Sequence, residues 1–316
     1  NWLKVIRKEK LPPDQYSIYK SLTKYAYVNK NTLLRHLGID LKKGKKSMKV
    51  LFEPSAYNFK RLRDHNIICT NKSSIGIPQG APISSVLSNI YMVDYDLFFQ
   101  KMSGNLDFIY RRYCDDILFI CKHGQADDII KLAYDKIEEC QLTIQPKKEE
   151  KIIFTYGLNG KLRGFDKQRM EEDNLSVQAL RSTEGEKYYK NLQYLGFEFN
   201  GQNVYIRSSS MSRYFQRMKK GTETVVKMAY GPNGKGKKIF KRKLFSRYTH
   251  LGKRNFITYA LKAASDYYKN SNGEVKRGFN SPTIKKQVSR HFSKLKKIIE
   301  QKSKQRAENR GKPFKD

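Results

Sequence analysis

Two short apolar stretches give the clearest pattern in the chain. Residues 108–112 and 117–120 are rich in amino acids that favour β-strands, and only four residues separate them. Such a pair predicts a β-hairpin with Asp115 and Asp116 at or next to its turn. Two crowded carboxylates repel each other unless a cation neutralises them, and carboxylate oxygens are the ligands that Mg²⁺ prefers. The alternative for an isolated Asp-Asp pair is a solvated turn.

Hydrophobic residues at helical spacing predict helices on both sides of this hairpin. Upstream, Pro78, Gly80 and Pro82 mark a loop, and a helix is expected to begin near Pro82. Downstream, residues 126–140 carry apolar side chains with a helical period. Residues 191–199 are expected to form a strand and a turn.

The C-terminal part alternates between basic helical segments and polar ones. Helices are expected over residues 208–220, within 237–268 and over 282–302. Residues 270–281 are rich in Gly, Asn and Ser, which is typical of a linker. Residues 303–316 are polar without a clear period and are expected to be disordered.

The order of these elements predicts an α+β protein. It combines strands around the acidic pair and within residues 191–199 with helices, and its C-terminal part is expected to be basic and helical. The expected divisions are a helical region, the sheet domain, the basic helical domain and the tail, at residues 1–75, 76–205, 206–302 and 303–316.

The formal charge of +34 is concentrated at the C-terminal end. Residues 1–200 contain 33 basic and 24 acidic side chains, a net charge of +9, whereas residues 201–316 contain 31 and 6, a net charge of +25. Such an excess of Lys and Arg favours binding to nucleic-acid phosphates. The candidate nucleic-acid-binding residues lie in two basic segments: Arg213, Lys219, Lys220, Lys241, Arg242 and Lys243.

Several other classes of protein leave no trace in the sequence. The four cysteines lack the close pairing of a zinc site and fit a reduced, cytoplasmic setting. No apolar run is long enough to span a bilayer, so no membrane partner is expected. The five histidines form no nuclease-like cluster, and nothing fixes an oligomeric state.

Four motifs, in order along the chain, resemble those of reverse transcriptases. The resemblance covers about Gly76 to Phe199 and implies an α+β right-hand polymerase. Its palm would be a mostly antiparallel sheet with packed helices that carries the catalytic hairpin, and its thumb would be all-helical and basic. The motifs are the P-Q-G box at Gly76–Tyr91, the Y-x-D-D box at Tyr113–Asp116, a box ending in lysine at Gln141–Lys148, and the L-G primer grip at Asn191–Phe199.

The resemblance implies a role for each motif in RNA-templated DNA synthesis. Asp115 and Asp116 would hold two Mg²⁺ ions, with Mn²⁺ as the alternative metal. Lys148, or its rival Lys147, would protonate the departing pyrophosphate. Contacts with the nucleotide or template are expected from Pro78, Gln79, Gly80 and Tyr113, and the primer end is expected to lie against Leu195 and Gly196.

Details of the motifs indicate a bacterial enzyme of the retron, group II intron and defence-associated group. Ala81-Pro82 is more similar to retron and defence enzymes, and Cys114 replaces the alanine usual in retron and intron proteins. With residues 200–207, these features most resemble antiphage defence-associated reverse transcriptases, with type 2 as the first candidate. That resemblance implies a structured noncoding RNA template, dNTP substrates and a cDNA product.

One departure from the family concerns the aspartate of its first box, which completes the metal site. The upstream candidates are Asp14, expected in a loop, Asp40, before a lysine-rich run, and Asp64, in a basic helical stretch. None fits, so we expect the first box and the fingers to precede the given sequence. A two-carboxylate site is the alternative. Two other functions stay open: an intron maturase that assists splicing, and a catalytically idle RNA-binding scaffold.

Overall fold

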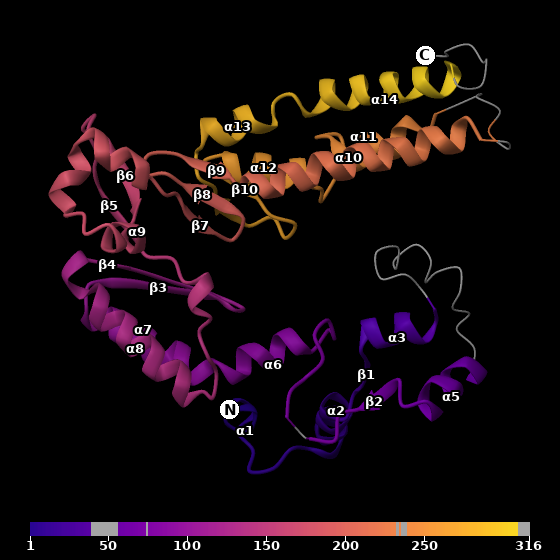
Figure 1. Ribbon diagram of the computed structural model, residues 1–316, viewed down its shortest axis with the longest axis horizontal. Coiled ribbons are helices and arrows are strands. Elements are labelled where there is room, and N and C mark those ends of the chain that lie inside the picture. Colours follow the sequence, from indigo (N-terminus) through magenta and orange to yellow (C-terminus); the bar gives the residue numbers. More distant parts are fainter. Residues whose placement is uncertain (39–55, 74, 232–233, 235–238, 309–316) are drawn as a thin grey trace. The chain divides into compact units, whose positions relative to one another are not determined.

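The protein forms two compact units, residues 1–143 and 144–316. The structure is a computed structural model that describes residues 1–38, 56–73, 75–231, 234 and 239–308 (Figure 1). Each unit combines helices with small antiparallel sheets, as expected for an α+β protein. Within the described ranges, no helix is both long and apolar enough to cross a bilayer.

The first unit holds the predicted hairpin among helices. The helix expected over residues 126–140 is observed as α8, and the hairpin as β3 and β4. Its elements are α1 (Trp2–Ile6), α2 (Pro13–Thr23), β1 (Ala26–Val28), α3 (Lys30–His36), α5 (Ala56–Asp64), β2 (Ile68–Thr70), α6 (Ser84–Tyr91), α7 (Val93–Asn105), β3 (Phe108–Tyr113), β4 (Asp116–Cys121), a 3-10 turn (His123–Gln125) and α8 (Ala126–Glu139).

An aromatic cluster packs α7 against the β3–β4 hairpin. Phe99 is fully buried, with ring centroids 4.9 Å from Phe119 and 5.3 Å from Tyr110. Along β3, Phe108 and Tyr110 are buried while Ile109 is exposed, which is the alternation of a strand with one covered face. The hairpin therefore has a fixed inner face against α7.

The second unit contains two small sheets, followed by helices that include a third, two-stranded sheet. Its first part comprises a 3-10 turn (Pro146–Lys148), β5 (Ile152–Tyr156), β6 (Leu162–Asp166), α9 (Lys167–Glu172), 3-10 turns (Val177–Arg181 and Thr183–Tyr188), β7 (Leu192–Tyr194), β8 (Phe197–Phe199) and β9 (Val204–Ile206). Its second part comprises α10 (Ser208–Ala229), α11 (Lys241–Tyr248), α12 (Phe256–Ala264), β10 (Tyr267–Lys269), β11 (Val275–Arg277), α13 (Pro282–Val288) and α14 (His291–Glu308).

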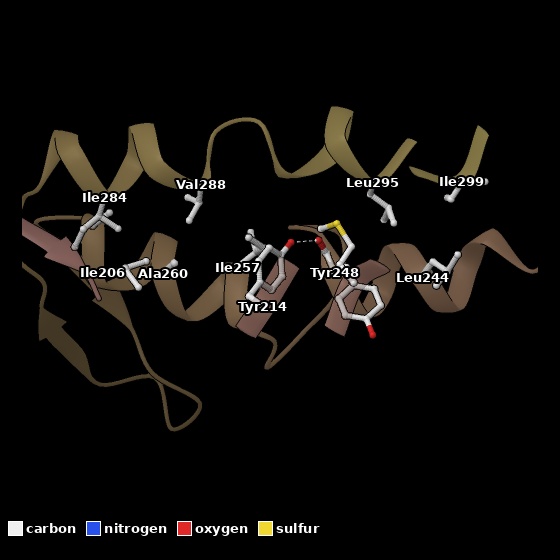
Figure 2. Packing of buried hydrophobic residues seen from close by; sticks show 12 residues of the cluster. Ile206, Tyr214, Leu244, Tyr248, Ile257, Ala260, Ile284, Val288, Leu295 and Ile299 are labelled. Atoms are coloured by element: carbon white, nitrogen blue, oxygen red, sulfur yellow. Dashed lines mark hydrogen bonds between the residues drawn. The ribbon is translucent and has the colours of Figure 1, made fainter. Parts of the chain in front are cut away.

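The helices of the second unit enclose a continuous apolar core. Figure 2 shows Ile284, Val288 and Leu295 directed toward side chains from β9 and helices α10–α12. Met218, Ile257 and Leu295 are completely buried there. The Tyr214 hydroxyl donates a hydrogen bond of 2.7 Å to the backbone carbonyl of Tyr248, so the aromatic groups at the centre satisfy their polar atoms as well.

The C-terminal elements differ from the sequence-based expectation in several respects. The helix expected over residues 208–220 continues to Ala229, and the helix expected over residues 282–302 is divided into α13 and α14. Residues 267–277 form the β10–β11 hairpin instead of a linker, so the basic region is not all-helical. Asn270 stabilises its turn, because its side-chain oxygen accepts hydrogen bonds from the amides of Asn272 and Glu274. The last helix also continues beyond Lys302 to Glu308, since Ser303 and Ala307 are buried and extend its inner face.

Candidate active site

The acidic pair lies at the closed end of the β3–β4 hairpin. Tyr113 pairs with Asp116, so Cys114 and Asp115 form a two-residue turn. Cys114 has φ of 55°, in the left-handed region, which costs an L-residue about 1–2 kcal/mol. A turn held in this conformation needs compensating contacts nearby.

The side chains at this turn are open to solvent. Asp115 and Asp116 are exposed, and the Tyr113 ring is 62% exposed beside them. These three residues are therefore brought together, as predicted, at one end of the hairpin. Adjacent exposed carboxylates are a donor set suited to a hard divalent cation.

A partly buried ion pair lies next to the turn. Arg112 donates two hydrogen bonds to the Asp96 carboxylate, of 2.7 Å from Nε to Oδ1 and 2.5 Å from Nη2 to Oδ2. The Tyr110 hydroxyl donates to the same Oδ1 at 2.6 Å. The Arg112 side chain is 6% exposed and that of Asp96 is 24% exposed, so the pair is partly shielded from water and loss of one partner is expected to destabilise the hairpin.

The pKa values in this cluster follow from burial and from Asp96. Hydrogen bonding to Asp96 raises the pKa of Arg112, against the opposing effect of burial. Burial, reinforced by the Asp96 hydrogen bond, raises the pKa of Tyr110 far above its ordinary value. Arg112 thus stays charged and Tyr110 stays a hydrogen-bond donor.

Sequence reasoning missed this pair, although a signal was present. Strand alternation places Arg112 on the same face as Phe108 and Tyr110, which is the covered face. A charged residue on a covered face requires a partner of opposite charge. The identity of that partner, Asp96 on α7, depends on tertiary packing and has no local signature.

The P-Q-G loop precedes a helix that contacts the hairpin. Gly80 has φ of 96°, and among the described residues, its chain neighbours apart, no atom lies within 4 Å of where a Cβ would be, so its backbone is both glycine-dependent and open. The Ser84 hydroxyl donates to the Pro78 carbonyl at 2.8 Å and ties the loop to α6, which begins at Ser84, slightly later than expected. Gln79 is exposed.

Helix α6 reaches the hairpin through one side chain. The amide oxygen of Asn89 accepts a hydrogen bond of 3.3 Å from Arg112 Nη1. The P-Q-G helix and the acidic turn therefore share Arg112 as a common partner. In the described part of the chain, no hydrogen bond links Pro78, Gln79 or Gly80 directly to the two aspartates.

Two predicted motifs belong to the second unit. Lys148 and Lys147 are exposed in the 3-10 turn before β5. Leu195 and Gly196 form the tight turn between β7 and β8, with φ of 49° and 85°. Positive φ at both central residues is the signature of a type I′ hairpin turn, which is unusual for leucine. Leu195 is 42% exposed at this turn.

The predicted nucleic-acid-binding cations lie on the outer faces of the second unit's helices. Arg213, Lys219 and Lys220 are exposed on α10, opposite its buried residues. Lys241, Arg242 and Lys243 are exposed on α11. Among the described residues, none of the six forms an ion pair, so their charges are available to an external polyanion.

A third carboxylate for the metal site is not found among the described residues, where no three His, Cys, Asp or Glu side chains cluster. Asp64 ends helix α5, as its basic surroundings predicted. Asp14 lies in the first turn of α2 and not in a loop, because Pro13 can start a helix. Asp40 lies outside the described residues.

Comparison with known proteins identifies the family. The sequence model of the family "Reverse transcriptase (RNA-dependent DNA polymerase)" matches residues 15–199. The match includes the P-Q-G loop, the acidic hairpin and the β7–β8 turn, and it begins well upstream of Gly76. The search of curated proteins gives no match. Because the family match covers more than half of the chain, this protein belongs to the reverse transcriptase family and is an RNA-directed DNA polymerase, a nucleotidyltransferase.

Proposed function

We propose that Asp115 and Asp116 are the metal-binding carboxylates of this polymerase and that Mg²⁺ is the ion they bind. The observation that carries the proposal is their joint exposure on a turn whose Cys114 carbonyl accepts a hydrogen bond from Arg112, which Asp96 holds in turn. Hard oxygen donors of this kind fit Mg²⁺, and Mn²⁺ is the alternative. When bound, the divalent ion supplies charge neutralisation for phosphoryl transfer.

The other residues at this end of the chain would position the nucleotide and template. The open backbone at Gly80 allows a base pair to approach closely, and the exposed Gln79 amide can hydrogen-bond to a nucleotide edge or sugar. The exposed Tyr113 ring offers a face against which a base or sugar can pack. Pro78 restricts the loop that carries them.

Residues of the second unit would act on the leaving group and the primer. In the transfer, the primer 3′-hydroxyl attacks the α-phosphate of the dNTP and pyrophosphate leaves. Lys148, an exposed ammonium, would donate a proton to that pyrophosphate, and Lys147 is its rival. The exposed Leu195–Gly196 turn would support the primer end, and the six exposed cations of α10 and α11 would hold phosphates.

We further propose that the template is a dedicated structured noncoding RNA, copied into cDNA in bacterial antiphage defence. Support comes from the Tyr113-Cys114-Asp115-Asp116 form of the motif and from the strong positive charge after residue 200. A dedicated RNA held by a basic surface would remain with the enzyme during purification.

Sequencing of the nucleic acid that copurifies with the protein tests this function. The wild type is expected to carry one discrete RNA and DNA complementary to it. The Asp115→Asn/Asp116→Asn variant is expected to carry the RNA without the DNA. A random RNA population would contradict the dedicated template. Unchanged DNA in the variant would contradict the assignment of the carboxylates.

A further inference from the structure

One side chain, Arg112, contacts three elements around the acidic turn. Its guanidinium binds Asp96 of α7 through two hydrogen bonds and Asn89 of α6 through a third. Its Nη1 also donates a hydrogen bond of 2.8 Å to the backbone carbonyl of Cys114. Arg112 therefore connects both helices with the turn that carries the two aspartates.

The contact with Cys114 acts where the turn needs support. Cys114 is the residue with the left-handed backbone, and its carbonyl belongs to the peptide unit that leads into Asp115. A donor fixed on that carbonyl restrains the orientation of the peptide plane and hence the direction of the Asp115 side chain. Asp96 in turn fixes the donor, because a bidentate carboxylate leaves the planar guanidinium little freedom.

We propose that Arg112, held by Asp96, is a positioning residue that keeps the Cys114–Asp116 turn in the geometry needed for metal binding. The inference rests on the proposed role of Asp115 and Asp116 as metal ligands. It assigns to Arg112 no contact with substrate; the residue acts through the backbone of the turn. It also accounts for a charged side chain on the covered face of β3.

The same hairpin offers a matched control at its open end. Lys122 and Asp107 form an ion pair of 2.8 Å there, with side chains 72% and 80% exposed. Asp107 precedes β3 and Lys122 follows β4, so this pair joins the two strands at the end opposite the aspartates. Unlike the Arg112–Asp96 pair, it is solvated. Exposed pairs of this kind contribute little to structure.

The test compares full-chain variants Arg112→Lys, Asp96→Asn, the double variant and the control Lys122→Ala. Lysine keeps the positive charge, but its compact ammonium group cannot bind the Asp96 carboxylate through two parallel hydrogen bonds and reach the Cys114 carbonyl as well. Three quantities are measured: peptide-resolved hydrogen exchange over residues 110–119, the Mg²⁺ concentration giving half-maximal dNTP incorporation, and the rate at saturating Mg²⁺ and dNTP.

For Arg112→Lys we expect exchange at the turn to accelerate at least about tenfold while the rest of the first unit is unchanged. The rate should fall at least about tenfold and the Mg²⁺ midpoint should rise, since small misplacements of reacting groups are costly. The double variant should be no worse than the more impaired single variant within about twofold, because both changes remove one contact system. Lys122→Ala should match the wild type.

Two results would overturn the inference. The first is a rate of hydrogen exchange at the turn of Arg112→Lys that equals the wild-type rate, whatever the activity of the variant. The other is accelerated exchange spread uniformly over the first unit, including loss of folding, which would make Arg112 merely structural. Because hydrogen exchange requires no turnover, the inference can be judged even if the wild type fails to incorporate dNTPs and the proposed function fails instead.

Discussion

The acidic hairpin of the first unit and the helical region of the second unit are built on different principles. The hairpin turn is fixed by directional hydrogen bonds from Arg112 to Asp96 and to the Cys114 carbonyl. The helical region is held by a continuous apolar core in which Met218, Ile257 and Leu295 are fully buried. Its charges lie outside, on exposed faces of α10 and α11.

The difference suggests how each region can fail. A turn positioned by a few directional bonds should lose its function when one donor or acceptor is changed. A surface of many similar cations on an apolar scaffold should lose affinity gradually, one phosphate contact at a time, and fail abruptly only when the scaffold itself is damaged. The following experiments sharpen that contrast, from the largest expected effect to the smallest.

The apolar scaffold can be tested at its centre. Leu295→Ala should lower the free energy of unfolding by about 2–5 kcal/mol, because it removes a completely buried side chain and leaves a cavity. Leu251→Ala, at a site 61% exposed in the same region, should change it by no more than about 0.5 kcal/mol. Urea denaturation measures both. Equal effects would contradict the core as described.

The outer charges can be tested by salt dependence. Replacing Lys241, Arg242 and Lys243 with glutamine should reduce the slope of log affinity for RNA against log salt by up to about three units. Each phosphate contact releases counterions when it forms, and a contact that is lost no longer does so. Related and unrelated RNAs should weaken alike, because phosphate contacts carry no sequence information.

Lys131→Gln is the control for this titration. Lys131 is exposed on α8, a helix rich in Asp and Glu, where phosphates are repelled. Lys131→Gln should leave the salt slope unchanged, whereas the matched single variant Lys241→Gln should reduce it. If the triple variant kept the wild-type slope, the proposal that α11 contacts RNA phosphates would be contradicted.

The helical region should also respond to pH through His291. This side chain is buried, with Nε2 at 3.0 Å from His250 Nδ1, and burial lowers its pKa. The unfolded chain, with a pKa of about 6.5, then binds the proton more readily than the folded one, so stability is lost as pH falls below about 6.5. In His291→Gln, the denaturation midpoint should depend less on pH between about pH 5 and pH 7 than it does in the wild type. This range of pH lies around the ordinary pKa of histidine. An unaltered pH profile would contradict this origin.

The smallest effect is expected for the replacement of Cys114 by glycine. Glycine adopts φ above zero without strain but gains freedom in the unfolded chain, so Cys114→Gly should change stability by at most about 1 kcal/mol. Cys114→Val should cost more than about 1 kcal/mol, because a β-branched residue strongly resists this backbone. Thermal unfolding of the two variants measures this difference in stability. Equal stability would mean that the turn relaxes.

Much of the local structure could be predicted from the sequence because its signals are local. The β-favouring runs on either side of the acidic pair predicted the β3–β4 hairpin, and the apolar period over residues 126–140 predicted α8, observed as Ala126–Glu139. The order of the motifs predicted the reverse transcriptase family, which the family match confirms. The roles of Asp115, Asp116 and Lys148 remain predictions.

Two errors arose from signals given too little weight. Asn272-Gly273 between short β-favouring stretches is a strong hairpin signal, and it marks the β10–β11 turn that was predicted as a linker. Small residues at Ser303 and Ala307 continue the four-residue spacing of Leu295 and Ile299 along α14. They were overlooked because they are not large and apolar.

The contacts of Arg112 could not be predicted in the same way. Its partner Asp96 lies 16 residues away on another element, and the Cys114 carbonyl is a backbone atom whose position depends on the turn. Such contacts are specified by packing between elements, and sequence patterns report only that a buried arginine needs an acceptor.

Replacement of the acidic pair is the most direct test of the account. The Asp115→Ala/Asp116→Ala variant and the wild type are compared for dNTP incorporation on a primed RNA template with Mg²⁺, and for RNA affinity in the same buffer. We predict that incorporation is abolished, because the carboxylates that hold the ion are gone. RNA affinity should be unchanged, because it depends on the cations of the helical region, which the substitution leaves in place. DNA synthesis by the variant at a rate near that of the wild type would contradict the central claim.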